Sequence, residues 1–358
     1  TGALDNARPM RDDAGDARVG GRRFLPRRPR EYASAGKMAN LDQLASVTLS
    51  HVVGGNADGC RALDMRAVGG IDLRILPDRG FDLGPAWFRG VPLAWISAVG
   101  ERSPLDSPNG RVWIEAIGGG LVTTCGLRNV GAPSEGHGVH GRYSHIRSSD
   151  VRTNRGFEGG DVVLTGSATI DEVEAPGRHM RVGRTVRTRT GTGLVELTDV
   201  TTNLGVGPEP VPLLYHVNVG VPLLDEGARV EIDSEEVLPR DADAERGRDS
   251  WMAPEPGAFE MVFEHLVRPD PSGWAGASVV NPSLCLALDV RWRHAELPRL
   301  HQWIHPGRGI YVVGLEPANC SVLGRAADRS AGVLPMLEPL EARATMLRIH
   351  VRSVPGEG

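Results

Sequence analysis

Apolar and polar residues alternate with a period of two along most of the chain. The segments that show it are 61–67, 71–76, 161–170, 181–190, 194–203, 283–292, 310–315 and 344–351. This period is expected of β-strands with one buried face. Gly191-Thr192-Gly193 separates two such segments, and Ala67-Val68-Gly69-Gly70 ends another. Both are typical of hairpin connections, so the pattern predicts many antiparallel strands.

Helical periodicity is scarce. Residues 40–46 could form a short helix, with Leu41 and Leu44 about one turn apart. The rest of the sequence shows no alternation of strands and helices, no internal repeat and no linker-like gap. The polar stretch 239–249 is expected to be a loop within the domain. We therefore predict an all-β fold, a large antiparallel β-sandwich with few short helices. It would form one domain over residues 40–358, after an Arg-rich lead-in over residues 1–39.

Charge and composition limit the kinds of partner that the sequence predicts. The formal net charge is -5 and the sequence pI about 6.1, which gives no electrostatic reason to expect nucleic acid. The basic run Arg22, Arg23, Arg27, Arg28 and Arg30 is expected to be a solvated lead-in rather than a binding arm. No apolar run is long enough for a transmembrane helix and no signal-peptide pattern is visible, so the sequence predicts a cytoplasmic protein.

The cysteines and lysines limit the chemistry further. Cys60, Cys125, Cys285 and Cys320 are far apart and form no CxxC pair, so they are expected to be reduced thiols. Lys37 is the single lysine and lies before the first clear strand. Schiff-base and pyridoxal phosphate chemistry needs a lysine amine buried in a site, so that class of reaction is excluded.

Three segments carry chemically capable side chains where strands meet loops. His140 lies in the Gly-rich segment GHGVHG at 136–141, and His216 lies with Asn218 in LLYHVNVG at 213–220. If the second segment is a strand, His216 and Asn218 share one face. Glu316 ends the apolar segment YVVGLEPAN at 311–319. Each residue has an ordinary alternative: a loop histidine, a satisfied core histidine, and a carboxylate paired with an arginine. Together they could also bind a metal, although no HExxH-like spacing is present.

The order of these motifs resembles the aldose 1-epimerase superfamily, and in particular its DUF4432 branch. The segments that carry the resemblance are LPDRGFD at 76–82, TTCGL at 123–127, VHG at 139–141, YHVN at 215–218 and GLEPAN at 314–319. The resemblance spans roughly residues 40–352. It implies the fold of galactose mutarotase, a supersandwich of antiparallel β-sheets.

The resemblance also implies catalytic roles. His140 would hydrogen-bond the sugar, His216 would act as general acid toward the ring oxygen, and Glu316 would act as general base on the anomeric hydroxyl. This chemistry fits the residue types, because opening a hemiacetal removes a proton from O1 and delivers one to O5. A carboxylate and an imidazole supply such a pair near neutral pH. No cofactor and no metal are needed.

Further candidates would contact the substrate. The arginine that galactose mutarotases carry before the His-Gly motif has no clean counterpart, and Arg79, with Asp82 beside it, is our first choice for that role. Arg128 occupies a similar stretch, and Asn218, Gln302 and Trp303 complete the candidate substrate-binding set. Asp78, Arg79 and Asp82 could instead form a turn held by local ion pairs. A tryptophan can stack on the apolar face of a pyranose, but Trp303 could equally be a core residue.

We therefore predict an isomerase that interconverts sugar anomers, with a sugar or sugar acid as its small-molecule partner. One alternative is an epimerase or lyase that acts on an oxidised or acidic sugar, since a pocket arginine suits an anionic substituent. The other is a non-catalytic carbohydrate-binding protein on the same fold. A pure binder needs no acid–base pair, which favours the enzyme. Exposed edge strands could pair into a homodimer.

Overall fold

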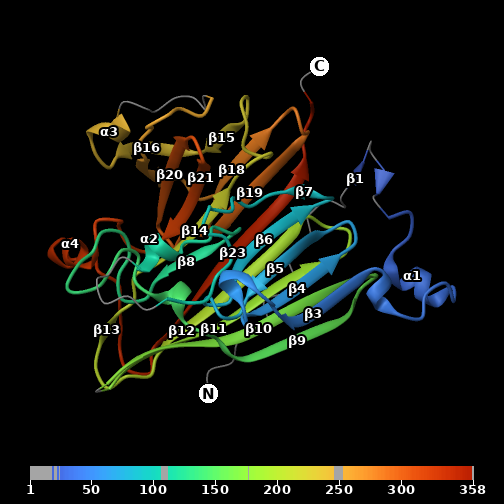
Figure 1. Cartoon of the computed structure of the whole chain (residues 1–358), viewed down its shortest axis with the longest axis horizontal. Coiled ribbons are helices and arrows are strands. Elements are labelled where there is room, and N and C mark those ends of the chain that lie inside the picture. The colour runs from blue at the N-terminus through green and yellow to red at the C-terminus, as the bar shows by residue number, and fades with distance from the viewer. Residues whose placement is uncertain are drawn as a thin grey trace.

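The structure is a computed structural model that describes residues 18–19, 22–23, 25–105, 112–175, 177–245 and 253–356. Strands dominate it, and they form antiparallel sheets stacked in two layers (Figure 1). The all-β prediction is confirmed. The predicted lead-in lies partly outside the described residues.

One layer is an eight-stranded sheet in which neighbouring strands pair antiparallel. Its strands, in spatial order, are β15 (Arg229–Ile232), β18 (Trp274–Asn281), β19 (Leu286–Arg293), β23 (Ala342–Ser353), β12 (Leu194–Asn203), β11 (Arg178–Arg189), β10 (Asp161–Glu174) and β9 (Ser149–Glu158). In the six inner strands buried positions largely alternate with more exposed ones, as expected of a sheet with one face in the core, whereas the edge strands β9 and β15 have no buried position.

The other layer contains two sheets joined edge to edge. The six-stranded sheet has the order β16 (Ser234–Pro239), β17 (Met261–Val267), β20 (Arg299–Gly307), β21 (Ile310–Ala318), β14 (Leu213–Val219) and β8 (Thr123–Gly126). The five-stranded sheet has the order β3 (Ala45–His51), β4 (Arg61–Ala67), β5 (Ile71–Leu76), β6 (Asp82–Phe88) and β7 (Val91–Pro92). An isolated bridge between Leu83 and Val122 connects them.

Helices are short and peripheral. They are α1 (Pro29–Ser34), α2 (Val112–Ala116), α3 (Ala242–Glu245) and α4 (Arg325–Ser330), with single 3₁₀ turns η1 (Leu41–Gln43), η2 (Gly55–Ala57) and η3 (Tyr143–His145). Two small ribbons pair β1 (Arg18–Val19) with β2 (Arg22–Arg23) and β13 (Glu209–Pro210) with β22 (Met336–Leu337). The predicted helix over 40–46 is wrong: Asn40 caps the turn η1 by accepting from the amide of Asp42, and strand β3 begins at Ala45.

A buried polar network ties the two layers together behind β14. The guanidinium of Arg184, on β11, lies 2.8 Å from Asp82 on β6 and 2.7 Å from Asp199 on β12. Tyr215 donates its hydroxyl to Asp199 over 2.7 Å. Breaking such a network would leave buried charges without partners. It therefore fixes β14 and β6 against the large sheet.

Candidate active site

His216 and Asn218 share one face of strand β14. Successive side chains of a strand point to opposite faces, so Tyr215 and Val217 face the large sheet while His216 and Asn218 face away from it. Tyr215 does reach Asp199 and Thr345 in the large sheet. Both His216 and Asn218 are buried. The imidazole therefore lies on the outer face of the six-stranded sheet, yet out of contact with bulk water.

Glu316 reaches the same face from the neighbouring strand β21. Its Oε1 atom lies 3.0 Å from Nε2 of His216. Gly314, two residues before Glu316, makes room for this contact. A Cβ atom at Gly314 would lie 2.7 Å from Glu316 Oε1 and 2.9 Å from His216 Cε1. The glycine is thus required by close packing of the pair, since its backbone φ is not in the left-handed region.

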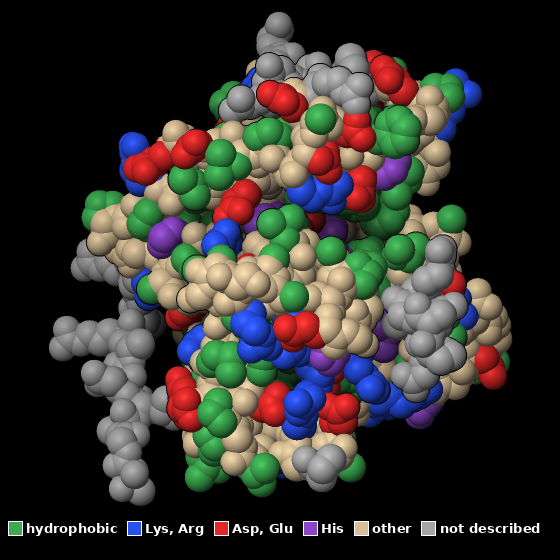
Figure 2. All heavy atoms as spheres, turned by 90° about the vertical axis from the view of Figure 1, so that its left-hand side faces the viewer, with side chains coloured by type: hydrophobic (Ala, Val, Ile, Leu, Met, Phe, Trp, Pro, Cys, Tyr) green, Lys and Arg blue, Asp and Glu red, His purple; other side chains and the backbone are tan. Residues whose placement is uncertain are grey.

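Aromatic rings surround the pair. His140 comes from the loop before η3 and has a φ of 55°, and its Nδ1 accepts a hydrogen bond from the amide of Gly131 over 3.3 Å. The His140 ring centroid lies 6.2 Å from that of His216. The Trp113 ring, on α2, is 4.4 Å from His140, and the Trp303 ring, on β20, is 5.2 Å from His216. Figure 2 shows histidine side chains recessed on the face of the molecule that carries α2 and α4.

Burial controls the protonation of these groups. It raises the pKa of Glu316 to about 8 and lowers the pKa of His216 to about 4, because a buried site disfavours both the carboxylate and the imidazolium. Burial, followed by the nearby His216 and His301, lowers the pKa of His140 to about 3. Near neutral pH, His216 and Glu316 therefore hold one proton between them. A pair in this state can give one proton and take another.

Several polar atoms at this place have no hydrogen-bond partner among the described residues, although they are buried. They are His216 Nδ1, Asn218 Oδ1, His301 Nδ1, Trp113 Nε1 and Glu316 Oε1, which lies 3.0 Å from His216 Nε2 but forms no hydrogen bond with it. Buried polar atoms are normally satisfied, and each exception calls for a reason. Donors and acceptors gathered beside aromatic rings suit a ligand rich in hydroxyl groups.

Sequence reasoning missed three residues of this group. His301 is the register partner of Glu316 on β20 and donates from Nε2 to the carbonyl of Cys320 over 3.1 Å, which leaves Nδ1 as an acceptor. Counting by two along the chain from Trp303 would have placed His301 on the same face. Gly314 could have been found in the same way from Glu316. Trp113 carries no comparable signal, because α2 follows residues with no strand periodicity.

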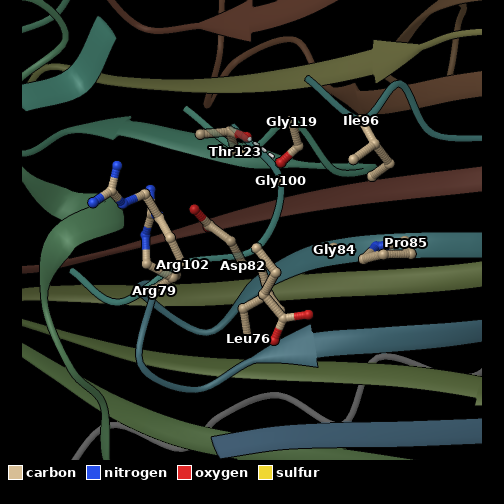
Figure 3. Close-up of a pocket in the computed structure, with 12 residues that line it drawn as sticks. Leu76, Arg79, Asp82, Gly84, Pro85, Ile96, Gly100, Arg102, Gly119 and Thr123 are labelled. Atoms are coloured by element: carbon tan, nitrogen blue, oxygen red, sulfur yellow. Dashed lines mark hydrogen bonds between the residues drawn. The ribbon is translucent and has the colours of Figure 1, made fainter. Parts of the chain in front are cut away.

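Arg79 and Asp82 make contacts other than those predicted. Arg79 is buried and donates from Nε to the carbonyl of Ser144 over 2.5 Å and from Nη2 to that of Ala116 over 2.9 Å. Asp82 accepts from Arg184 and from the amide and hydroxyl of Thr124. Figure 3 shows both side chains at the wall of a small cavity. Asp82 thus belongs to the network between the layers, and Arg79 holds α2 in place.

Arg128 and Gln302 are separated from the group. Arg128 lies 3.6 Å from Glu172 and 3.7 Å from Glu209 in a buried charge network. Gln302 precedes Trp303 on β20 and so faces the opposite side of the sheet, where its Oε1 lies 3.0 Å from Nε2 of His265. The structure therefore brings together His140, His216, Glu316, Asn218 and Trp303, and does not bring Gln302, Arg128 or Asp82 to them.

The motifs and this fold have a counterpart among protein families. Residues 57–351 match the model of the family described as domain of unknown function DUF4432. The chain belongs to the DUF4432 family. No curated protein matches this DUF4432 chain in sequence.

Solved structures share the fold of this DUF4432 protein. A candidate aldose 1-epimerase from Klebsiella pneumoniae is 23% identical, with a TM-score of 0.81 over 88% of this chain and 87% of its own. A galactose mutarotase-like protein from Clostridium acetobutylicum is 14% identical, with a TM-score of 0.60 over 87% of this chain and 100% of its own. A candidate mutarotase from Salmonella typhimurium is 13% identical, with a TM-score of 0.56 over 88% and 96%. At these identities the likeness establishes the galactose mutarotase-like fold.

Two further observations concern the described part of this DUF4432 chain. No helix there is both long and apolar enough to cross a bilayer. Nor do three or more His, Cys, Asp or Glu side chains gather there in an arrangement that could hold a metal ion. The four cysteines are free thiols, of which Cys285 is exposed.

Proposed function

We propose that this protein interconverts the anomers of a sugar by acid–base opening and closing of its ring. The contact of 3.0 Å between His216 Nε2 and Glu316 Oε1 carries the proposal. An acid and a base that share one proton, set among unsatisfied polar atoms and aromatic rings, match the demands of hemiacetal opening. Structural relatives described as candidate aldose 1-epimerases and mutarotases support it.

The reaction is balanced in protons. The base takes the proton of the anomeric hydroxyl O1, the C1–O5 bond breaks as C1=O1 forms, and the acid protonates O5. Rotation about C1–C2 presents the other face of the carbonyl, and the reverse transfers close the ring. Family resemblance makes Glu316 the base and His216 the acid, which requires the shared proton to rest on His216 when sugar is bound.

The residues around the pair would orient the ring. His140 accepts at Nδ1, so its neutral ring carries the proton on Nε2 and can donate it to a sugar hydroxyl. Asn218 Oδ1 and His301 Nδ1 are free to accept from hydroxyl groups. Trp303 or Trp113 would cover an apolar face of the pyranose.

The test is saturation-transfer NMR of anomeric exchange, applied to neutral, acidic and phosphorylated aldoses and ketoses. Wild-type protein should accelerate exchange for at least one of them. Glu316→Gln and His216→Asn should remove this acceleration while sugar binding persists. Glu235→Gln serves as a matched control, because Glu235 is exposed and pairs only with Arg268 among the described residues. Full activity of Glu316→Gln would refute the assignment. Binding without exchange by wild type would identify a sugar-binding protein instead.

A further inference from the structure

Two arginines, Arg79 and Arg102, form a cation group beside the candidate active site. Arg79 and Arg102 each hold a backbone carbonyl of α2. Arg79 Nη2 donates to Ala116 over 2.9 Å, and Arg102 Nη1 donates to Glu115 over 3.2 Å. The two side chains lie next to each other in Figure 3, and burial and then the charge of Arg102 lower the pKa of Arg79. Two neighbouring like charges are unfavourable unless something compensates for them.

His145 adds a third basic group with no partner. Its side chain is buried, with 6% exposed, and neither ring nitrogen has a hydrogen-bond partner among the described residues. Burial, then Arg79, Arg142 and Arg102, lowers its pKa to about 3, so the ring is uncharged near neutral pH, and the carbonyl of the adjacent Ser144 accepts from Arg79 Nε. Ser144 Oγ and Arg102 Nε are also buried and unsatisfied. No described protein group satisfies these polar atoms, so they are available to bind a ligand.

The carboxylates near Arg79 and Arg102 already have other partners. The cavity that these arginines line also contains Asp82 and Glu101. Asp82 is bound by Arg184, although its charge still attracts Arg79. Glu101 Oε2 lies 3.4 Å from Arg74 on β5, while Glu101 Oε1 is buried with no hydrogen-bond partner among the described residues.

The carboxylates near His145 also have other partners. His145 lines a cavity of about 320 Å³ that is separate from the one lined by Arg79 and Arg102, and Asp171 and Glu172 contribute to its wall. Asp171 lies 2.8 Å from Arg181, and Glu172 lies 3.6 Å from Arg128. No described carboxylate near His145 therefore forms an ion pair with Arg102. Arg79 is the buried cation of this group and forms no ion pair with a described carboxylate, and an unpaired buried cation is costly, so the group is complementary to an anion.

This cation group is connected to the acid–base pair. Thr123 lines the cavity of Arg79 and Arg102, and it is the register partner of His216 between β8 and β14. The cavity measures about 40 Å³, room for about three waters at ~10–15 Å³ each. This suits one charged group of a few atoms, not a whole sugar ring.

We propose that Arg79, Arg102 and His145 bind the oxyanion substituent of an acidic sugar, a carboxylate, sulfonate or phosphate, whose anomeric carbon lies at His216 and Glu316. This rests on the proposed function for the position of the sugar ring. Guanidinium groups match the planar geometry of such anions, and charge-assisted hydrogen bonds are the stronger kind. The substrate class is thus anionic sugars rather than neutral ones.

The test compares matched sugars by calorimetry, in a Glu316→Gln background so that binding is measured without turnover. Glucose, glucuronate, glucose 6-phosphate and inorganic phosphate are titrated. An acidic sugar should bind at least ~10-fold more tightly than glucose, and Arg102→Gln should reduce that preference ~10-fold or more. His145→Gln should weaken it too, and it provides a second variant if Arg102→Gln folds poorly. Arg268→Gln, which removes an exposed arginine paired with Glu235, should change nothing.

The outcomes separate the two proposals. Equal binding of glucose and the acidic sugars, or a preference that survives both substitutions, would overturn the anion site. Binding of inorganic phosphate that depends on Arg102, without binding of any acidic sugar, would reduce it to a site for a free oxyanion and overturn the substrate class. An intact, Arg102-dependent preference in a protein that accelerates no anomeric exchange would instead refute the isomerase.

Discussion

His216 and Glu316 face each other across two neighbouring strands, and Gly314 is the residue that lets them meet. With Nε2 and Oε1 3.0 Å apart, a methyl group at Gly314 would enter the space of both side chains. We expect Gly314→Ala to lower kcat/KM at least ~10-fold by separating or tilting the pair, since small misplacements in a site are costly. NMR exchange measurements on the folded variant provide the readout.

Gly183→Ala is the matched control for this substitution. Gly183 also lies within a strand, β11, but a Cβ atom there would have no neighbour within 4 Å. It should therefore keep wild-type activity. If Gly314→Ala is as active as Gly183→Ala, contact between the two side chains is not required for turnover.

The shared proton predicts the pH dependence of the reaction. Below the pKa of His216, about 4, both groups are protonated and no base remains. Above the pKa of Glu316, about 8, both are deprotonated and no acid remains. We expect kcat/KM, corrected for spontaneous mutarotation at each pH, to form a bell with a plateau between these values. A rate that still rises above pH 9 would exclude this pair as the proton donor and acceptor.

The buried network behind the site predicts a stability effect. Arg184→Met would leave the carboxylates of Asp82 and Asp199 buried without their cation, and we expect a loss of about 3–5 kcal/mol in the free energy of unfolding. Arg181→Met on the same strand removes an arginine that is 47% exposed and pairs with Asp171, and it should cost less than ~1 kcal/mol. Urea denaturation measures both. Equal losses would show that the buried ion pairs of Arg184 stabilise the fold no more than the exposed pair of Arg181.

The strands were predictable where local pattern decides them. β4, β5 and β12 have the bounds that alternation and glycine turns predict, whereas β19 begins at Leu286 because residues 282–285 form a turn. The helix over 40–46 failed because pairing of β3 with β4 overrides a weak helical pattern.

The site was predictable only in part, for a different reason. Residues of adjacent strands, such as His216 and Glu316, follow from motifs and strand alternation. The same alternation, applied to β20, would have separated Trp303 from Gln302 in advance. The positions of Trp113 and Arg79 depend on how loops pack over the sheet, and no periodic signal encodes this.

His140 offers the last prediction, because the structure specifies its tautomer. The amide of Gly131 donates to Nδ1, so Nε2 carries the proton and can donate to the sugar without acting in proton transfer. Loss of one such hydrogen bond, worth ~1 kcal/mol, should raise KM about 5–10-fold in His140→Ala with a smaller change in kcat. His137→Ala, in the same loop and bound to Arg325, is the control and should leave both constants near wild type. A collapse of kcat with KM unchanged in His140→Ala would show instead that His140 takes part in the chemical step.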